Sequence, residues 1–292
     1  MKFNCTSSAA WLIIALAGCF SACSSGTSNT IAYPQPTPDS AAKVFLPGIV
    51  SKDTLDFNAT FTADGKTFLF ARSQNRKYMI FQSVYSNKQW QPETISPLFD
   101  TLYSNVDPFV AADSAIYFIS NRPKDNSDTT KDYDIYRMAK LADGYAAPEY
   151  LAAVNSDSTE YYVSVSRSGA IFFSSYRDGN LDLYVSKKGV NGYERPVTLG
   201  NSVNTQSDEH DPLIAPDESY IVFASDRPGG LGQADLYISY NLNGQWQTPT
   251  ALGHGINTKT YEYCPYLSPD GKYFFFSSEF NVKWIGSDVL KR

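Results

Sequence analysis

Short apolar runs alternate with turn-forming residues from about residue 44 to the end of the chain. The segment FNATFTADGKTFLFA recurs, with its pattern of apolar and polar positions, as VDPFVAADSAIYFIS, YYVSVSRSGAIFFSS, HDPLIAPDESYIVFAS and YCPYLSPDGKYFFFSS. The turn residues at the centre of these segments are spaced 49, 55, 49 and 53 residues apart; they are Asp64, Asp113, Ser168, Asp217 and Asp270. Self-similarity at a nearly fixed period indicates a repeat architecture, here with five repeats.

The pattern within one repeat predicts four strands, A to D. Strand A ends at a Pro-Asp-Gly-like turn, and strand B is an almost continuous apolar run such as Ile221 to Phe223, which is typical of a strand covered on both faces. Strand C carries Asp-Ile-Tyr or Asp-Leu-Tyr. An Asn-Gly or Asp-Gly hairpin, such as Asn243-Gly244, leads to strand D, which opens with an aromatic residue and then proline. We therefore expect an all-β, five-bladed β-propeller of four-stranded blades, with blades 1 to 5 numbered along the chain.

The fifth repeat ends after Trp284-Ile285 and has no strand D of its own. At the other end of the chain, residues 44–49 (VFLPGI) match residues 251–256 (ALGHGI), which form the exit from strand D of the fourth repeat. We predict that this N-terminal strand completes the fifth blade and closes the ring, so that the propeller covers residues 43–292. Such closure removes exposed sheet edges and ties the two ends of the domain together.

These motifs resemble the TolB-like β-propeller repeats, also called WD-like Pro-Asp repeats, and the resemblance covers residues 44–292. Its most specific part is residues 225–232 (SDRPGGLG), followed by Asp235-Leu236-Tyr237. This loop, with Gly253 and residues 256–258 (INT) downstream, is similar to the propeller part of envelope proteins in which an OmpA-like peptidoglycan-binding domain follows. The resemblance implies a propeller of the cell envelope.

The first eighteen residues have the composition of a lipoprotein signal peptide. Lys2 precedes an apolar stretch at residues 9–17 (AAWLIIALA), which is too short to span a bilayer. The stretch ends in Leu-Ala-Gly-Cys19, which resembles a bacterial lipobox, so we predict lipidation of Cys19; Cys23 is a weaker candidate, and an ordinary secretory signal cut near Ala22 is the alternative. Residues 19–42 are rich in Ser, Thr and Pro, which predicts a lipidated flexible tether. We expect a monomer in the cell envelope that contacts the outer membrane only through its lipid, on the periplasmic or the surface side.

Composition excludes one class of partner. The formal net charge of −6 argues against nucleic acid, whose phosphates require a basic surface. Cys264 is the one cysteine within the predicted propeller, so no disulfide framework holds the fold. Its 18 phenylalanines and 21 tyrosines supply the bulk for sheet packing instead.

Alignment of the repeats places one polar residue per blade at the start of strand A, beside the predicted channel. In a propeller the D-to-A and B-to-C loops emerge on the same face, so these residues would form a ring at a channel mouth. The ring consists of Asp56, Asn105, Glu160, Glu209 and Glu262. Like charges converging on a channel mouth are unfavourable unless something binds them, which suggests a cation or a basic partner segment. The alternative is that each acid caps the backbone N–H groups of its own D-to-A turn.

Blades 2, 3 and 4 alone combine an arginine in the B-to-C loop with an Asp-x-Tyr motif in strand C. In blade 5 Phe280 and Val282 stand at these positions, and in blade 1 Met79 replaces the aspartate. Joint presence and loss predict that each arginine pairs with the aspartate of its own blade. The predicted structural pairs are Arg122 with Asp134, Arg177 with Asp182, and Arg227 with Asp235. The alternative is that the arginines neutralise the acids of the ring.

Blades 1 and 5 meet at the predicted closure and offer aromatic residues in place of the Arg/Asp pair. Tyr78, Phe81, Phe280 and Trp284 would make this sector a docking or sugar-stacking patch. Packing of these rings between the blades is the alternative.

Catalysis has little support in the sequence. The two histidines, His210 and His254, do not form a metal-binding motif, and no Gly-x-Ser-x-Gly elbow is present. We expect neither a metal nor another cofactor, and we expect Cys264 to be a buried, inert thiol. The leading hypothesis is a non-enzymatic envelope lipoprotein that binds a protein, or a glycan, through its loop face and acidic channel mouth. The alternative is a carbohydrate-active enzyme, a glycoside hydrolase or an oligogalacturonate-lyase-like protein, that uses the carboxylates at the channel mouth.

Overall fold

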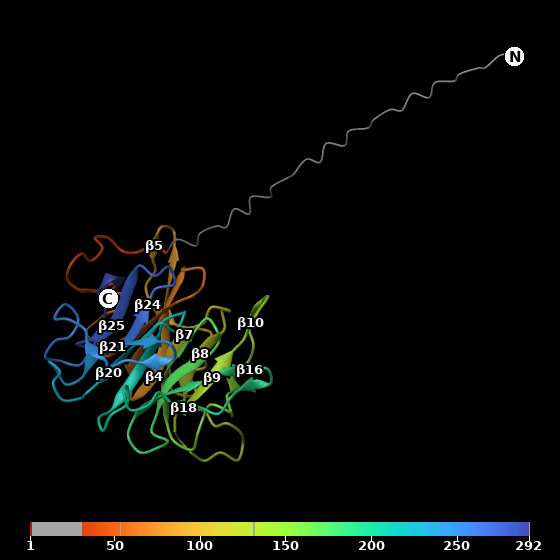
Figure 1. The fold of residues 1–292 in the computed structure, drawn as a ribbon. Helices are drawn as coiled ribbons and strands as arrows, with labels where there is room; N and C mark the ends of the chain where they lie inside the picture. The colour runs from red at the N-terminus through yellow and green to blue at the C-terminus, as the bar shows by residue number, and fades with distance from the viewer. Residues whose placement is uncertain (2–30, 53, 131, 292) are drawn as a thin grey trace.

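The five repeats form five antiparallel sheets around a common axis in the computed structural model, which confirms the predicted five-bladed propeller (Figure 1). The structure describes residues 1, 31–52, 54–130 and 132–291. The inner strands of the blades contact one another in ring order: β2 lies against β7, β7 against β13, β13 against β19, β19 against β24, and β24 against β2. Within the described residues, no helix is long and apolar enough to cross a membrane.

Blades 1 and 2 have the predicted strand order. Blade 1 contains β2 (Asp56–Phe61), β3 (Thr67–Gln74), β4 (Lys77–Ser86), β5 (Gln89–Trp90) and β6 (Thr94–Ile95), of which β5 and β6 both pair with β4. Blade 2 contains β7 (Asn105–Val110), β8 (Ile116–Ser120), β9 (Asp134–Met138) and β12 (Glu149–Tyr150), with a separate hairpin of β10 (Lys140–Leu141) and β11 (Gly144–Tyr145).

Blades 3 and 4 repeat this arrangement. Blade 3 contains β13 (Glu160–Val165), β14 (Ile171–Ser175), β15 (Asp182–Ser186) and β18 (Val197–Thr198), with a hairpin of β16 (Lys188–Gly189) and β17 (Gly192–Tyr193). Blade 4 contains β19 (Glu209–Ile214), β20 (Tyr220–Ser225), β21 (Asp235–Leu242), β22 (Gln245–Trp246) and β23 (Thr250–Ala251). The Asn-Gly and Asp-Gly pairs lie at the predicted hairpins, where the glycines of Asp143-Gly144 and Asn243-Gly244 have positive φ angles.

The N-terminal strand closes the ring as predicted. Blade 5 contains β24 (Tyr263–Leu267), β25 (Tyr273–Ser278) and β26 (Asn281–Gly286), and its fourth strand is β1 (Lys43–Val44), which pairs antiparallel with β26. A short 3-10 helix (Ser287–Leu290) follows. Phe45, directly after β1, is fully buried with its ring 4.7 Å from that of Phe68 in blade 1 and 5.0 Å from that of Phe275 in blade 5. The closure is therefore held by aromatic packing as well as by strand pairing.

Residues 31–42, expected to belong to the flexible tether, lie against the propeller instead. Ile31 is buried, the Trp90 indole N–H donates to the carbonyl oxygen of Ala32 (2.8 Å), and the Tyr33 ring stacks on that of Trp284 (5.8 Å between centroids). The apolar side chains of residues 31–33 (IAY) explain why this part of the tether is packed on the propeller, because they fill the seam between blades 1 and 5. The predicted signal peptide, Cys19, Cys23 and the rest of the tether lie outside the described residues.

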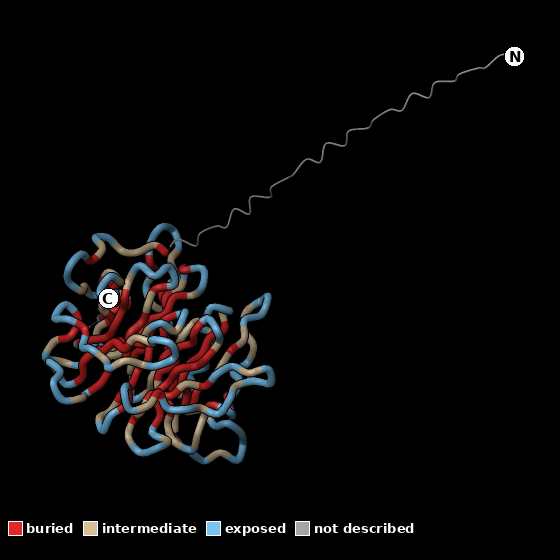
Figure 2. Tube along the Cα trace, viewed as in Figure 1, coloured by how far each residue is buried: buried red, intermediate tan, exposed pale blue. Residues whose placement is uncertain are grey.

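The strands of the blades are buried and the turns at both ends are exposed (Figure 2). The buried apolar side chains of neighbouring blades pack together in clusters. The B strands are the most deeply buried, as their continuous apolar runs predicted; every residue of β8 and of β14 is buried. The fold thus presents two faces. The A-to-B turns and C-to-D hairpins form one, called here the turn face, and the D-to-A and B-to-C loops form the other, the loop face.

Candidate functional site

The five ring residues occupy one equivalent position per blade, as the alignment predicted, but they do not line an open mouth. Four of them begin the innermost strand of their blade and the fifth directly precedes it; none is more than 1 % exposed. They are Asp56, Asn105, Glu160, Glu209 and Glu262. Burial removes these side chains from contact with a ligand on the loop face.

The carboxylates of the ring are bound within their own blades. Glu160 accepts hydrogen bonds from the backbone N–H of Ser156 (3.2 Å) and from the hydroxyl of Ser175 (2.9 Å). Glu209 is bound in the same way by Thr205 and Ser225, and Glu262 by Thr258 and Ser278. Each carboxylate therefore joins the D-to-A turn to the end of strand B, which agrees with the capping alternative.

The predicted arginine–aspartate pairs are wrong. The Arg177 guanidinium donates to Glu160 (2.9 Å), and that of Arg227 donates to Glu209 (3.0 Å). Arg122 donates to Asn105 (2.9 Å) and to Asp100 (2.8 Å). The sequence had instead predicted Asp182 as the partner of Arg177, Asp235 as that of Arg227, and Asp134 as that of Arg122. Arginines therefore neutralise Glu160 and Glu209, whereas Glu262 is bound by the backbone N–H of Thr258 and by hydroxyl groups. The argument for a cation bound by the ring is weakened accordingly.

The tyrosine of the Asp-x-Tyr motif explains why arginine and motif occur together. The Arg177 guanidinium lies between two aromatic rings, 4.9 Å from the centroid of Tyr184 and 5.0 Å from that of Phe173. Arg122 and Arg227 stack in the same way on Tyr136 and Tyr237. Stacking over an aromatic ring stabilises a cation. The arginine therefore stacks on the tyrosine, whereas the aspartate two residues earlier binds other groups of the loop: Asp182 accepts from the Asn180 amide, and Asp235 accepts from the backbone N–H of Leu231.

Blade 1 has the same arrangement in a different register. Arg72, at the end of strand B, forms an ion pair with Asp56 and a second one with Glu93 (3.0 Å), and its guanidinium lies 4.7 Å from the ring centroid of Phe81. Arg72 stands at the strand position that serine occupies in the other blades. This position is two residues before that of the arginines in blades 2, 3 and 4. Our expectation that blade 1 lacks the arginine was wrong.

Two aspartates of the Asp-x-Tyr motif have a buried oxygen without a hydrogen-bond partner among the described residues, namely Oδ1 of Asp134 and of Asp235. Burial, followed by the charges of Asp132 and Glu160, raises the pKa of Asp134 to about 7. Burial and the charge of Glu209 raise the pKa of Asp182 to about 6. The carboxyl groups of Asp134 and Asp182 are therefore sites of electrostatic strain.

The aromatic patch predicted at the seam belongs mainly to the core. Trp284 and Phe81 are buried, and Tyr78 is half-buried with its backbone N–H bound to the hydroxyl of Ser104. Phe280 alone of the four is exposed, at 61 %. The expected docking patch is thus reduced to one side chain, in agreement with the packing alternative.

The propeller axis is blocked between the two faces by a layer of buried residues. Each innermost strand has a bulge two residues after its ring residue, where the backbone turns to positive φ; the bulge residues are Asn58, Asp107, Tyr162, Asp211 and Cys264. Contacts cross the axis at this level: the Tyr162 hydroxyl in blade 3 donates to the carbonyl of Pro265 in blade 5 (2.6 Å).

The ionisable groups of this layer are buried away from solvent. Burial, together with the charge of Asp211 from a non-neighbouring blade, raises the pKa of Asp107 well above its ordinary value. Asp211 accepts hydrogen bonds from the backbone N–H of Cys264 (3.0 Å) and lies 3.3 Å from Nδ1 of His210. Within the described part of the chain, no group of three or more His, Cys, Asp or Glu side chains could hold a metal ion.

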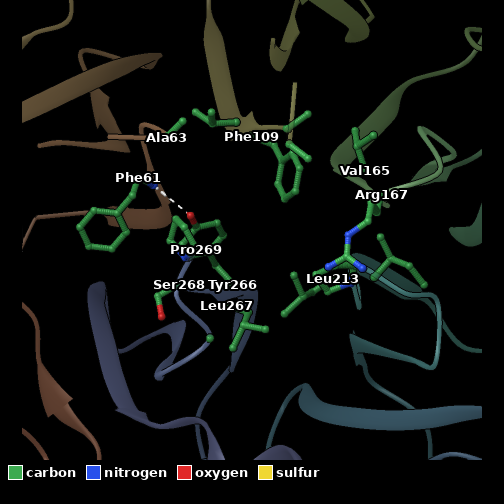
Figure 3. A pocket seen from close by; sticks show the side chains of 16 residues that line it. Phe61, Ala63, Phe109, Val165, Arg167, Leu213, Tyr266, Leu267, Ser268 and Pro269 are labelled. Atoms are coloured by element: carbon green, nitrogen blue, oxygen red, sulfur yellow. Dashed lines mark hydrogen bonds between the residues drawn. The ribbon is translucent and has the colours of Figure 1, made fainter. Parts of the chain in front are cut away.

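An apolar funnel opens on the turn face, above the blocked layer. Its volume is about 360 Å³, and every blade contributes to its wall (Figure 3). The side chains labelled along the wall include Phe61, Phe109, Val165, Leu213 and Tyr266. Cavities of this size and character commonly bind ligands. The funnel is therefore the candidate functional site of the propeller.

Among the described residues that line the funnel, Arg167 alone has a cationic side chain. It lies in the A-to-B turn of blade 3, its backbone N–H donates to the carbonyl of Pro216 (2.9 Å), and its side chain reaches toward Leu213 (Figure 3). Among the described residues, no ion pair or hydrogen bond of its guanidinium is found.

The sequence analysis missed this funnel, although a signal for it exists. An apolar residue stands three positions before each turn anchor: Phe61, Val110, Val165, Ile214 and Leu267. All five line the funnel. A residue packed in the core gives the same apolar signal, so the pattern alone does not separate the two roles.

Comparison with solved structures shows which fold this is. TolB from Acinetobacter baumannii matches with a TM-score of 0.51 at 14 % identity, over 80 % of this chain and 54 % of that one. A putative TolB from Agrobacterium tumefaciens matches with a TM-score of 0.51 at 17 % identity, over 80 % and 72 %. The fold is a TolB-like β-propeller. The chain spans about half the length of the Acinetobacter protein.

The same fold is found in an enzyme. A gluconolactonase from Xanthomonas campestris matches with a TM-score of 0.50 at 12 % identity, over 78 % of this chain and 70 % of that one. No family model and no curated protein sequence matches the chain. The TolB-like fold alone therefore does not identify a function, which depends on the chemistry of the site.

Proposed function

We propose that this chain is a non-enzymatic binding protein of the cell envelope whose funnel on the turn face accepts an apolar segment of a protein partner. The observation that carries the proposal is the funnel itself: a preformed apolar cavity on the propeller axis, open to the turn face and closed below by the bulge layer. Apolar cavities bind by removing apolar surface from water, without any requirement for reactive groups.

The state of the acids favours binding over catalysis. Glycoside hydrolysis by two carboxyl groups requires that both face the substrate. Glu160, Glu209 and Glu262 are fully buried and accept hydrogen bonds from their own blades. His210 is also engaged, because its Nε2 is 2.7 Å from the hydroxyl of Tyr261. The carbohydrate-active alternative thus loses the carboxylates on which it depended.

The path of the N-terminal segment gives the funnel a direction relative to the predicted lipid anchor. Ile31 packs against Gly65, and the Tyr33 hydroxyl donates to Asp270 (2.7 Å). Gly65 and Asp270 belong to A-to-B turns, as do Ala63 and Pro269 in the funnel wall. A lipid on Cys19 would therefore hold the turn face toward the membrane, and the partner would be a membrane-associated protein of the envelope.

Two matched tryptophan variants test the proposal. Ala112 is exposed in the funnel wall, so Ala112→Trp is expected to block the funnel without entering the core. Ala153 is exposed in a D-to-A turn on the loop face, so Ala153→Trp is the control. Each variant is crosslinked in intact envelopes, and the captured proteins are identified by mass spectrometry.

We expect one protein to be captured by the wild type and by Ala153→Trp and to be lost with Ala112→Trp. Capture that is lost with Ala153→Trp and kept with Ala112→Trp would place binding on the loop face and contradict the proposal. A glycan array is run beside the capture. Specific glycan binding without a protein partner would favour the glycan alternative.

A further inference from the structure

We propose that Arg167 makes the funnel a receptor for the free C-terminus of a peptide, with the α-carboxylate on the guanidinium and the last apolar side chains in the funnel. This inference rests on the proposed function, since it names the chemistry of the partner segment at the same site. Three properties of the turn face support it: the guanidinium without a carboxylate partner, the apolar wall beside it, and the acidic residues of the turns around the mouth.

The Arg167 guanidinium differs from the structural arginines of the propeller. Arg72, Arg177 and Arg227 are each neutralised by a buried carboxylate of the ring. Arg167 has no such partner among the described residues, although it lies in a wall that also contains Val165 and Leu213. Arg167 is exposed at the rim of the funnel, so its guanidinium can offer its hydrogen-bond donors to an anion whose apolar part lies in the funnel.

Asp217, in the A-to-B turn of the neighbouring blade, does not accept hydrogen bonds from the Arg167 guanidinium. Asp217 accepts hydrogen bonds from the backbone N–H (3.2 Å) and the hydroxyl (2.6 Å) of Ser219, and these bonds are the largest cause of its lowered pKa. The charge of Arg167 lowers the pKa of Asp217 as well, but by less than the hydrogen bonds from Ser219 do. Two prolines of the turns, Pro216 and Pro269, also line the funnel and carry no N–H donor. The guanidinium is therefore the strong anion-binding group of this wall.

A carboxylate attached to an apolar chain matches this arrangement. The planar guanidinium binds a carboxylate through two parallel hydrogen bonds, which fix the orientation of the bound group. Apolar side chains directly before the carboxylate would fill the space beside Phe109, Val165 and Leu213. A peptide C-terminus with apolar last residues combines both features, and capture of a C-terminal carboxylate is an established mode of peptide recognition.

The acids of the A-to-B turns favour a peptide over a free fatty acid. Asp64, Asp217 and Glu218 accept hydrogen bonds from hydroxyl groups, at 2.6, 2.6 and 2.7 Å, and these bonds leave their negative charges in place. Asp113 lies in the same set of turns with a side chain that is 52 % exposed, and it is partly neutralised by the Arg137 guanidinium at 3.8 Å. A collar of negative charge repels an anionic lipid surface and attracts basic residues. We therefore expect Lys or Arg upstream of the apolar C-terminal residues.

The test uses two pools of synthetic hexapeptides, each with two lysines followed by four positions randomised among Ala, Val, Leu and Phe. One pool ends in a free carboxylate and the other in an amide. The full chain, immobilised, captures peptides from each pool, and mass spectrometry quantifies the bound fraction. Arg167→Gln is the test variant, and Arg76→Gln is its matched control, because Arg76 is exposed at the β3–β4 turn on the loop face.

We expect the wild type and Arg76→Gln to retain the free-acid pool at least about tenfold better than the amide pool, as the loss of a charge-assisted bidentate contact predicts. Arg167→Gln should retain both pools equally. Replacement of the two lysines by serine should weaken retention, and more so at low salt than at high salt.

Several outcomes would overturn the inference. Equal retention of acid and amide by the wild type, abolished by Ala112→Trp, would leave the funnel as a protein-binding site and show that the carboxylate is not recognised. Retention that is unchanged in Arg167→Gln would have the same meaning. Absence of retention of either pool, with binding of dodecanoate in its place, would identify the ligand as a lipid and contradict the inference together with the proposed function.

Discussion

The Arg177 guanidinium lies 2.9 Å from the Glu160 carboxylate, and this ion pair links the B-to-C loop of blade 3 to the start of its innermost strand. The Glu160 side chain is fully buried, and that of Arg177 is 15 % exposed. Glu209 and Arg227 repeat the pair in blade 4. The pair thus fixes the loop face of a blade to the inner wall of the ring, and it acts in stability rather than in ligand binding.

Replacement of Glu160 by glutamine tests this role. Glu160→Gln leaves the guanidinium of Arg177 without its counter-charge in a largely buried place, and we expect the free energy of unfolding to fall by about 3 kcal/mol. Chemical denaturation monitored by tryptophan fluorescence measures the change. A loss below about 0.5 kcal/mol would show that the pair is dispensable.

Asp182→Asn provides the matched control, because Asp182 was the partner that the sequence suggested for Arg177. Asp182 accepts a hydrogen bond from the amide of Asn180 (3.0 Å), and asparagine retains the accepting oxygen. Burial raises the pKa of Asp182 to about 6, so removal of its charge should leave stability at pH 8 unchanged or increased. A loss of stability as large as that of Glu160→Gln would indicate that Arg177 pairs with Asp182 after all.

Asp134→Asn should stabilise the propeller, and more so at high pH. Burial raises the pKa of Asp134 to about 7, against an ordinary value of about 3.9 for aspartate. The folded chain therefore holds a proton that the unfolded chain has lost, and the free energy of unfolding falls as the pH rises from about 4 to about 7. Asn at this position removes that dependence, so the gain in stability should be larger at pH 8 than at pH 4.

Urea unfolding at the two pH values measures this difference. Asp143→Asn, at an exposed hairpin of the same blade, controls for the removal of one negative charge. An equal effect of Asp134→Asn at pH 4 and pH 8 would contradict the strained carboxylate.

Closure of the ring by the N-terminal strand predicts a large effect at Phe45. The side chain is fully buried between the first and last blades, and its ring contacts those of Phe61, Phe68, Phe275 and Trp284. Phe45→Ala should lower the free energy of unfolding by about 4 kcal/mol. Val44→Ala, at a side chain that is 37 % exposed, should cost less than about 1 kcal/mol. Similar small losses at both positions would mean that the seam does not limit stability.

The repeat pattern was sufficient to predict the fold. Five turn anchors gave the number of blades, and the match of residues 44–49 with residues 251–256 predicted which strand closes the ring. Both inferences depend on backbone periodicity, which the sequence carries directly. The boundary of the tether was misplaced because three residues, Ile31 to Tyr33, are too few to show a pattern.

The partners of side chains were harder to predict than their positions. Alignment placed Glu160 and Arg177 correctly, but joint occurrence could not distinguish an arginine that pairs with Asp182 from one that stacks on Tyr184. Arg72 performs the same role from another register, and a long flexible side chain conceals such a shift. The funnel was missed because burial in a core and exposure to a cavity require the same apolar residues.

The Cys264 thiol reports whether the axis of the propeller stays closed. Cys264 is 2 % exposed within the bulge layer, and burial, followed by the charge of Asp211, raises the pKa of the thiol well above its ordinary value. Because the thiolate is the reactive form, a disulfide reagent at neutral pH should leave Cys264 unmodified in the folded protein. In a chain with Cys5, Cys19 and Cys23 replaced by serine, we expect one thiol to react only after unfolding in guanidinium chloride. The Ala112→Trp variant should give the same result, because the bulge layer, and not the open funnel, shields the sulfur. Rapid modification of the native protein, slowed by Ala112→Trp, would instead show that the funnel continues past Asp211 and Tyr162 toward the loop face.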